Sequence, residues 1–256
     1  MIGKFRGRVV VVALAVIAAG CGSADPEPLP PAPTMIPFSG DPFIETGIRP
    51  DPEAASEAGG ILLQWREPGA AELDGASIGA YIVYRSDSTR PDGSPAGFHP
   101  IASITAIPVG NDTTFSDTTA APYVRYWYAV GAESRSGGGV GPMSDAVAYT
   151  LSVRPIPVAP IGQLDSIDVS PLRFRYGPPI LGGEVAIHLY RVHPDNERVV
   201  LDTIWRSLGR GTFDDPTVAY DGPALTPGAH YRWRIDKITS RQPIGNASSW
   251  VTFVAP

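Results

Sequence analysis

Gly75, Ser77 and Gly79 match G-x-S-x-G, the pattern that surrounds the nucleophilic serine of many hydrolases. That chemistry requires a strand before the serine and a helix after it, so that the hydroxyl is exposed above a parallel sheet. In this chain a loop precedes the serine, and the run AYIVY at 80–84 predicts a strand where the helix should begin. We therefore interpret the match as a coincidence in a loop.

The histidines lack the spacing of a metal site. No two of them stand four residues apart, as the ligands of a helical zinc site do. His188 and His193 are five residues apart, so they would face opposite ways on one strand. We expect all the histidines to be solvated polar residues, and His230 to flank a turn. They are His99, His188, His193 and His230.

The acidic pairs are Asp214 with Asp215 and, more loosely, Asp112 with Asp117. Neither pair has the dense oxygen spacing of a calcium loop. Local turn hydrogen bonds are the expected role, with calcium at a domain junction as the alternative. The glycine-rich segment 135–141 lacks the lysine of a phosphate-binding loop, so it predicts a mobile loop and a candidate binding edge. Nothing forms a nucleophile–base set, a metal cluster or a carboxylate pair, so we expect neither catalysis nor a cofactor.

The first 21 residues read as an export signal. Lys4, Arg6 and Arg8 precede an apolar run at 9–19, which is shorter than the ~20 residues of a membrane-spanning helix. The ending AAGC resembles a bacterial lipobox, although Ala18 stands where an aliphatic residue is usual. The resemblance implies that Cys21 is lipidated. An ordinary signal peptide with a leftover cysteine is the alternative.

Several properties of the mature chain follow from this interpretation. Cys21 is the only cysteine, so no disulfide forms within the chain. Several acyl chains would anchor the protein in a membrane, and Gly22-Ser23, without aspartate, resembles the signal for the outer membrane or cell surface. Residues 22–44 are proline-rich and predict an extended tether. Without the basic residues of the signal, the formal net charge of −6 becomes −9, which argues against binding to nucleic acid.

The remaining chain predicts an all-β fold. With 28 glycines, 28 prolines and 18% charged residues, its composition favours many short strands. The stretch LTPGAHY at 225–231, followed by alternation through Ile235, resembles the start of strand F in fibronectin type III domains. That resemblance implies an immunoglobulin-like β-sandwich with a tyrosine corner at Tyr231, where the hydroxyl bonds to upstream backbone.

The body of the chain contains two copies of one unit. Four segments recur in the same order, including YWYAV at 126–130 and YRWRI at 231–235, at offsets between 98 and 111 residues. The third match pairs TFSD at 114–117 with TFDD at 212–215. Tyr126 is the corner of the first copy. The predicted organisation is two tandem fibronectin type III-like sandwiches behind a signal peptide and a proline-rich tether. Its segments are the signal and lipobox 1–21, tether 22–44, domain 45–150, proline-rich linker 151–162 and domain 163–256.

One surface patch could bind a partner. If Tyr81 and Val83 point into the core, then Ile82 and Tyr84 point outward, and Trp127 on the neighbouring strand lies beside them. A contiguous patch of this kind often marks an interface, although the second domain or residues 43–44 could also cover it.

We expect a non-catalytic envelope lipoprotein that acts as a spacer and protein-interaction module. The expected partner is a protein of the cell envelope. The alternative is carbohydrate or cell-wall binding through exposed aromatic residues such as Trp127 or Trp205.

Overall fold

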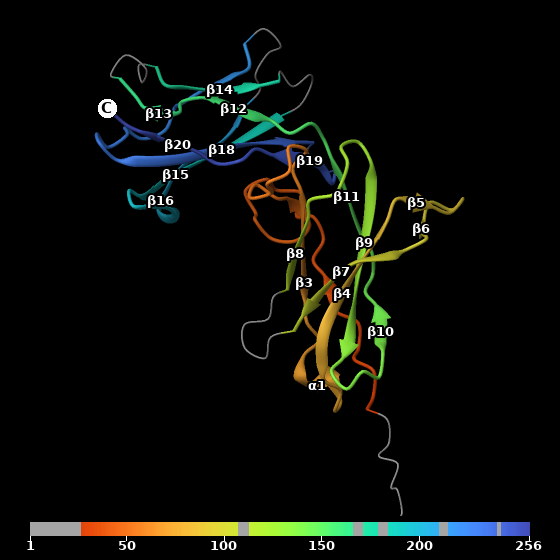
Figure 1. The fold of residues 1–256 in the computed structure, drawn as a ribbon. Coiled ribbons are helices and arrows are strands. Elements are labelled where there is room, and N and C mark those ends of the chain that lie inside the picture. Colours follow the sequence, from red (N-terminus) through yellow and green to blue (C-terminus); the bar gives the residue numbers. More distant parts are fainter. Residues whose placement is uncertain (1–26, 107–112, 166–170, 179–183, 210–214, 240–241) are drawn as a thin grey trace, which may run out of the picture.

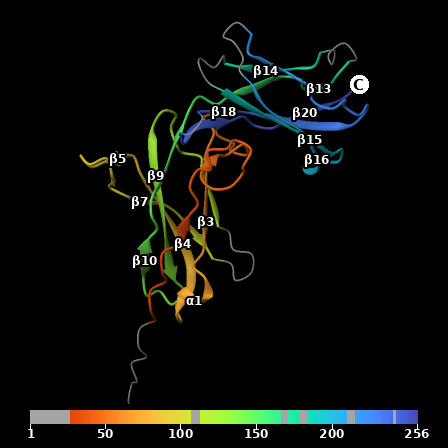
Figure 2. The ribbon, with the colours of Figure 1, turned by 180° about the vertical axis from the view of Figure 1, so that it is seen from behind.

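The computed structural model describes residues 27–106, 113–165, 171–178, 184–209, 215–239 and 242–256. In these residues the chain forms two β-sandwiches, domain 1 (residues 27–152) and domain 2 (residues 153–256), which together give an L-shaped molecule (Figures 1 and 2). The described part of the chain contains one helix, the single turn α1 (Ala70–Leu73) at the lower end of domain 1. The prediction of an all-β fold built from immunoglobulin-like sandwiches is therefore confirmed.

Domain 1 packs two sheets face to face. The smaller sheet is organised around β3, and the larger one is organised around β4 and β9. A short hairpin of β5 and β6 projects from the side. The smaller sheet contains β1 (Thr34–Met35), β2 (Arg49–Pro50), β3 (Ile61–Arg66) and β8 (Thr114–Asp117). The larger one contains β7 (His99–Thr105), β4 (Ile78–Ser86), β9 (Arg125–Ser134), β10 (Val140–Met143) and β11 (Val147–Leu151), and the hairpin pairs Ser88–Thr89 with Pro95–Ala96.

Domain 2 repeats this plan. Strand β14 is central to its smaller sheet, and β15 and β18 form the middle of its larger one. The smaller sheet contains β12 (Ile156–Ala159), β14 (Arg173–Gly177) and β17 (Thr217–Ala219). The larger one contains β16 (Asn196–Gly209), β15 (Glu184–His193), β18 (His230–Ile238), β19 (Ile244–Ala247), β20 (Val251–Val254) and β13 (Gly162–Gln163).

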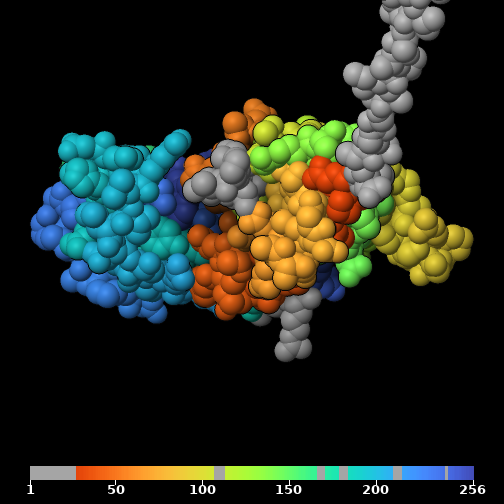
Figure 3. Space-filling model, turned by 90° about the horizontal axis from the view of Figure 1, so that it is seen from below, coloured from red at the N-terminus to blue at the C-terminus, as the bar shows by residue number. Residues whose placement is uncertain are grey.

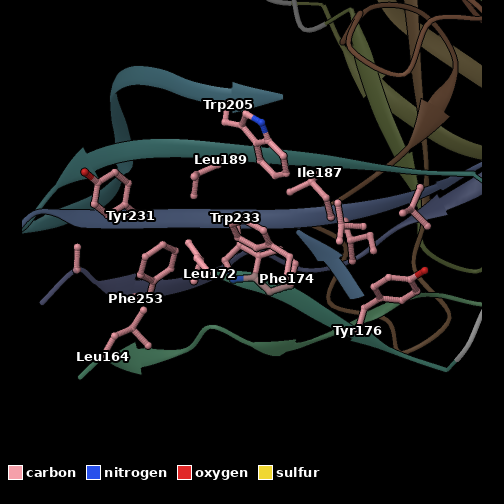
Figure 4. Close-up of a cluster of buried hydrophobic side chains, with 14 residues drawn as sticks. Leu164, Leu172, Phe174, Tyr176, Ile187, Leu189, Trp205, Tyr231, Trp233 and Phe253 are labelled. Atoms are coloured by element: carbon pink, nitrogen blue, oxygen red, sulfur yellow. The ribbon is translucent and has the colours of Figure 1, made fainter. Parts of the chain in front are cut away.

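Each core forms because alternate residues of facing strands point between the sheets. In domain 1, Leu63 and Trp65 of β3 are buried with Val83 of β4. In domain 2, Phe174 of β14 meets the indole of Trp233 of β18 edge to face, with ring centroids 4.8 Å apart (Figure 4). Aromatic burial of this kind supplies much of the stability of a domain that has no disulfide.

Both tyrosine corners are present. The hydroxyl of Tyr231 accepts a hydrogen bond from the backbone N–H of Thr226 at 2.8 Å, and that of Tyr126 accepts one from Ala121 at 3.3 Å. In each case the donor lies five residues upstream of the tyrosine. These bonds tie the turn before each strand to the phenol at the start of that strand, so each tyrosine fixes one end of its domain.

One sheet continues through both domains. Strand β11 of domain 1 pairs in parallel with β19 of domain 2, with Thr150 opposite Ile244 and Leu151 opposite Gly245. Hydrogen-bonded neighbours therefore run from β7 through β4, β9, β11, β19, β18 and β15 to β16. A backbone ladder, rather than a flexible linker, joins the two sandwiches.

Two segment boundaries differ from the sequence-based prediction. The described part of the expected tether, from residue 27 onward, is docked on domain 1: β1 pairs with β3, and Met35 is buried. The expected linker 151–162 is divided between the domains, because Leu151 ends β11 and β12 begins at Ile156. Met35 and Leu151 are buried, whereas Val153, Ile156 and Val158 are exposed. Proline is accepted in edge strands such as β12.

The internal repeat also needs one correction. Strand β17 begins at Thr217, so TFDD at 212–215 is not the counterpart of β8, and residues 212–214 lie outside the described chain. In register, Val218 faces Phe174 as Phe115 faces Leu63. The match between the two sequences was fortuitous, because the true counterpart shares only its strand pattern.

Candidate interaction surfaces and the interdomain joint

The predicted patch lies on one face of the larger sheet of domain 1. In register, Trp127 is opposite Ser86, and Ile82 is opposite Gly131, so Ile82, Tyr84 and Trp127 share the face turned away from the core. All three are half-buried. The guanidinium of Arg125 lies 5.2 Å from the centroid of the Trp127 ring. Trp127 therefore already has a cationic neighbour over its indole.

Phe43 was considered as a cover for that patch, but it packs elsewhere. Its ring meets the imidazole of His188 in domain 2 edge to face, with centroids 5.4 Å apart. His188 has no exposed surface, so the expectation that it is solvated was wrong. This contact could not be predicted from the local sequence pattern, because the loop that covers His188 comes from the other domain.

Trp205 is not an exposed aromatic residue. It is only 9% exposed and stacks on Phe174 in the core of domain 2 (Figure 4), while its Nε1 donates to Asp221 at 2.8 Å. A bulge shifts the register of β16 against β15 beside this residue. The shift changes which residues of β16 point inward, and strict alternation could not predict it.

Asp117 makes the local turn hydrogen bonds that the sequence predicts, whereas Asp214 lies outside the described residues. The buried Asp117 accepts hydrogen bonds from the backbone N–H and the hydroxyl of Thr119, at 2.9 and 2.7 Å. It also accepts from Arg85 and from Tyr128, both at 2.8 Å. Burial acts to raise the pKa of Asp117, but these donors outweigh it and hold the pKa below its usual value. Asp112 lies outside the described residues.

Arg154 is a central residue of the joint. Its Nη1 donates to the carbonyls of Ala54 and Ser56 at 3.0 and 2.5 Å, and its Nε donates to Ala247 at 3.0 Å. Its Nη2 lies 3.4 Å from the carbonyl of Pro52. One side chain therefore connects a domain 1 loop to the last strands of domain 2. Burial lowers the pKa of Arg154, and the nearby Asp51 opposes that shift.

Asn246 forms a second connection beside it. Its side chain has no exposed surface, and its Nδ2 donates to Ala58 and Ser152, both at 2.8 Å. Its Oδ1 accepts from the N–H of Ala247 at 2.9 Å. Gly59 has φ +89°, and a Cβ there would lie 2.5 Å from Oδ1 of Asn246. Glycine is therefore needed to let the domain 1 loop approach this amide.

Charged residues hold a third contact, where the loop at 41–47 crosses the outer face of the domain 2 sheet. Arg234 bonds to Asp236 through Nε at 3.0 Å and to Glu45 through Nη2 at 2.6 Å. Nε2 of His188 lies 3.0 Å from Asp236. Burial acts to raise the pKa of Asp236, but the charge of Arg234 and the neighbouring imidazole of His188 hold it below its usual value. Figure 3 shows domain 1 residues filling the angle between the domains.

Arginines and aromatic rings alternate next to this contact. Arg232 and Arg234 lie 4.3 and 4.6 Å from the centroid of Trp250, and Arg206 lies 5.7 Å from that of Tyr190. Alternation along the sequence places Arg232 and Arg234 on the face opposite Tyr231, Trp233 and Ile235 but does not predict what they contact. Their stacking depends on Trp250, which belongs to the loop before β20.

An open groove of about 770 Å³ lies at the joint. Residues from both domains line it, among them Glu57, Pro122, Val153, Ile156 and Pro157. Ile156 is 60% exposed, the largest fraction among the exposed aliphatic side chains of the described residues. The sequence analysis did not predict the groove, because five segments that lie about 20 to 200 residues apart line it.

The described residues contain no catalytic arrangement that we recognise. Ser77 precedes β4, and its hydroxyl donates to the carboxylate of Glu27 at 2.6 Å, so it acts as a contact for the docked N-terminal segment. The glycine-rich loop has a similar role, since a Cβ at Gly141 would overlap the carbonyl of Pro30. No group of three metal-ligating side chains occurs in the described ranges. Among their helices, none is long and apolar enough to cross a membrane.

Among known proteins, the chain is distantly similar to several solved structures. No family model matches the chain, and no curated protein matches it. A Fn3-like protein from Clostridium thermocellum is 20% identical, with a TM-score of 0.30, over 47% of this chain and 92% of that one. The FN1–FN3 domains of chicken CNTN1 are 14% identical, with a TM-score of 0.35, over 88% and 69%. Pectate lyase Pel3 from Pectobacterium carotovorum is 25% identical, with a TM-score of 0.27, over 40% of this chain and 26% of the enzyme.

Proposed function

We propose that this protein is a non-catalytic lipoprotein of the cell envelope, in which two β-sandwiches form a stiff spacer that presents a surface to a protein partner. The joint is the observation that carries the proposal. A shared sheet, Arg154 and Asn246 all fix one domain against the other. When two tandem domains are held in one orientation, the far domain stays at a fixed distance from the near one. A spacer requires this property.

The docked N-terminal segment supports a short tether. Glu27 is held on domain 1 by Ser77, so only residues 22–26 separate it from Cys21. Five extended residues reach at most ~18 Å. Lipidation at Cys21 would therefore keep the end of domain 1 that carries α1 close to the bilayer. Domain 2, at the other end of the molecule, would be furthest from it (Figure 1).

The carbohydrate-binding alternative loses support from the two residues that suggested it. Trp205 belongs to the core, and Trp127 lies beneath Arg125. Binding of a sugar ring by stacking requires an aromatic side chain with one exposed face. Neither Trp205 nor Trp127 offers such a face. We therefore retain protein interaction as the proposed activity.

Metabolic labelling with an alkyne-bearing fatty acid tests the anchor. The wild-type chain should incorporate the label and sediment with membranes, and Cys21→Ser should do neither. Ser23→Ala is the matched control and should behave like the wild type. A Cys21→Ser variant that still carries the label would refute lipidation at this residue.

Small-angle X-ray scattering tests the spacer. A locked joint predicts one maximum dimension that does not change with salt, together with a profile that a single L-shaped particle fits. Arg154→Ala combined with Asn246→Ala should broaden the distribution of interatomic distances. If the wild-type profile requires an ensemble of interdomain angles, the protein is not a stiff spacer.

A further inference from the structure

The groove at the joint is an apolar hollow that residues of both domains line. Val153 of the linker and Ile156 of β12 are exposed and belong to this lining. Monomeric proteins rarely leave aliphatic side chains contiguous at the mouth of a groove. These side chains would be covered if another chain occupied it.

The free edge of β12 restricts how an occupant can bind. The N–H of Tyr176 in β14 donates to Pro216, on the side away from β12. Pro157 is opposite Tyr176 in a pair that is not hydrogen-bonded across β12 and β14. The backbone carbonyl of Pro157 is therefore directed away from β14 and toward the open edge. Since proline has no N–H, this edge offers a carbonyl oxygen and lacks a donor at Pro157, which disfavours the addition of an ordinary strand.

The charges at the groove favour a donor-rich, positive occupant. Arg154 lines the groove, but its donors are directed at backbone carbonyls of the joint. Glu57 contributes an exposed carboxylate to the lining. Glu57 is the carboxylate among the described lining residues. A carbonyl acceptor and an exposed carboxylate complement a cation.

We propose that the groove binds a protein segment that combines aliphatic side chains with lysine or arginine. The aliphatic residues pack on Val153 and Ile156. The cationic groups donate to Glu57 and to the outward carbonyl of Pro157. This inference rests on the proposed function, for which it names the surface and the chemistry of the partner.

Fluorescence anisotropy with three octapeptide probes tests the inference. One alternates valine and lysine, one alternates valine and glutamate, and one alternates serine and lysine. The full chain carrying Cys21→Ser is kept in a neutral detergent throughout. We expect saturable binding of the valine–lysine probe, at least tenfold weaker binding of the other two, and a loss of affinity as salt rises.

Variants locate the site. Ile156→Asp should weaken binding of the valine–lysine probe about tenfold, because it puts a charge in the apolar wall. Glu57→Lys should weaken it and reduce its dependence on salt. Leu208→Asp is the matched control, since Leu208 is an exposed aliphatic residue on β16 and not in the lining. Leu208→Asp should bind like the parent chain.

Three results would overturn the inference: equal affinity for the lysine and glutamate probes, unchanged binding by Ile156→Asp, or equal losses for Ile156→Asp and Leu208→Asp. Thermal unfolding of each variant shows whether its fold is retained. Because labelling at Cys21 and X-ray scattering are measured separately, failure of peptide binding would leave the anchored spacer standing.

Discussion

The carboxylate of Glu45 in domain 1 accepts a hydrogen bond from Arg234 in domain 2 at 2.6 Å. This pair joins a loop of one sandwich to the outer sheet face of the other, a surface that faces solvent in an isolated domain. Arg234 is almost fully buried, and burial acts to lower its pKa, but Asp236 and Glu45 outweigh that effect and raise it. A buried cation needs such partners, so domain 2 depends on domain 1 to complete its surface.

Removal of Arg154 should uncouple the domains. Arg154→Ala leaves the carbonyls of Ala54, Ser56 and Ala247 without this donor, so we expect a loss of about 2–3 kcal/mol in unfolding free energy. Differential scanning calorimetry should show one transition for the wild type and two for the variant. Arg198→Ala, an exposed arginine of β16, is the control and should retain the single transition. If Arg154→Ala unfolds like the wild type, the joint does not depend on this residue.

The sequence predicted what each domain contains more accurately than how the domains meet. Tyr126 and Tyr231 could be recognised because a corner depends on a local turn and the alternation that follows it. His188 was misassigned because a loop some 145 residues earlier in the chain covers it. Arg154 looked like one charge among prolines, since its carbonyl partners have no side-chain signature. Contacts between distant segments leave little local pattern to read.

The pH dependence of stability should report on Asp236. Its pKa is lowered in the folded protein, so its contribution is present above the unfolded value of about 3.9 and is lost as pH falls through the folded pKa. We expect urea denaturation to show stability falling below about pH 4. Asp236→Asn should be less stable than the wild type at pH 7 and should lose less on acidification.

In Asp236→Asn, the dependence of the unfolding free energy on pH should become weaker without disappearing. The remaining dependence is expected because the pKa of Asp117 in domain 1 is also lowered. Asp202→Asn, at an exposed position of β16, provides the control and should follow the wild-type curve. If Asp236→Asn and the wild type lose stability in parallel between pH 7 and pH 3, Asp236 does not contribute through its charge.

The two corners should differ in strength. Tyr231→Phe removes a 2.8 Å hydrogen bond and leaves the N–H of Thr226 without its acceptor, at a cost of about 1–2 kcal/mol. Tyr126→Phe removes a longer bond of 3.3 Å, and we expect about half that cost or less. Urea denaturation of the two variants gives both values. A larger loss for Tyr126→Phe would show that the length of the bond does not set its contribution.

Trp127 tests the predicted patch separately from the groove. Its indole is half-buried on the outer face, and Arg125 lies over it, so Trp127→Ala removes a cation–π contact and leaves the core intact. We expect a loss of about 0.5–1 kcal/mol, with wild-type affinity for the valine–lysine probe. Trp65→Ala is the contrasting variant, because Trp65 is buried in the core, and it should cost about 3–5 kcal/mol. If Trp127→Ala is destabilised as strongly as Trp65→Ala, Trp127 contributes to the core and cannot serve as a surface for a partner.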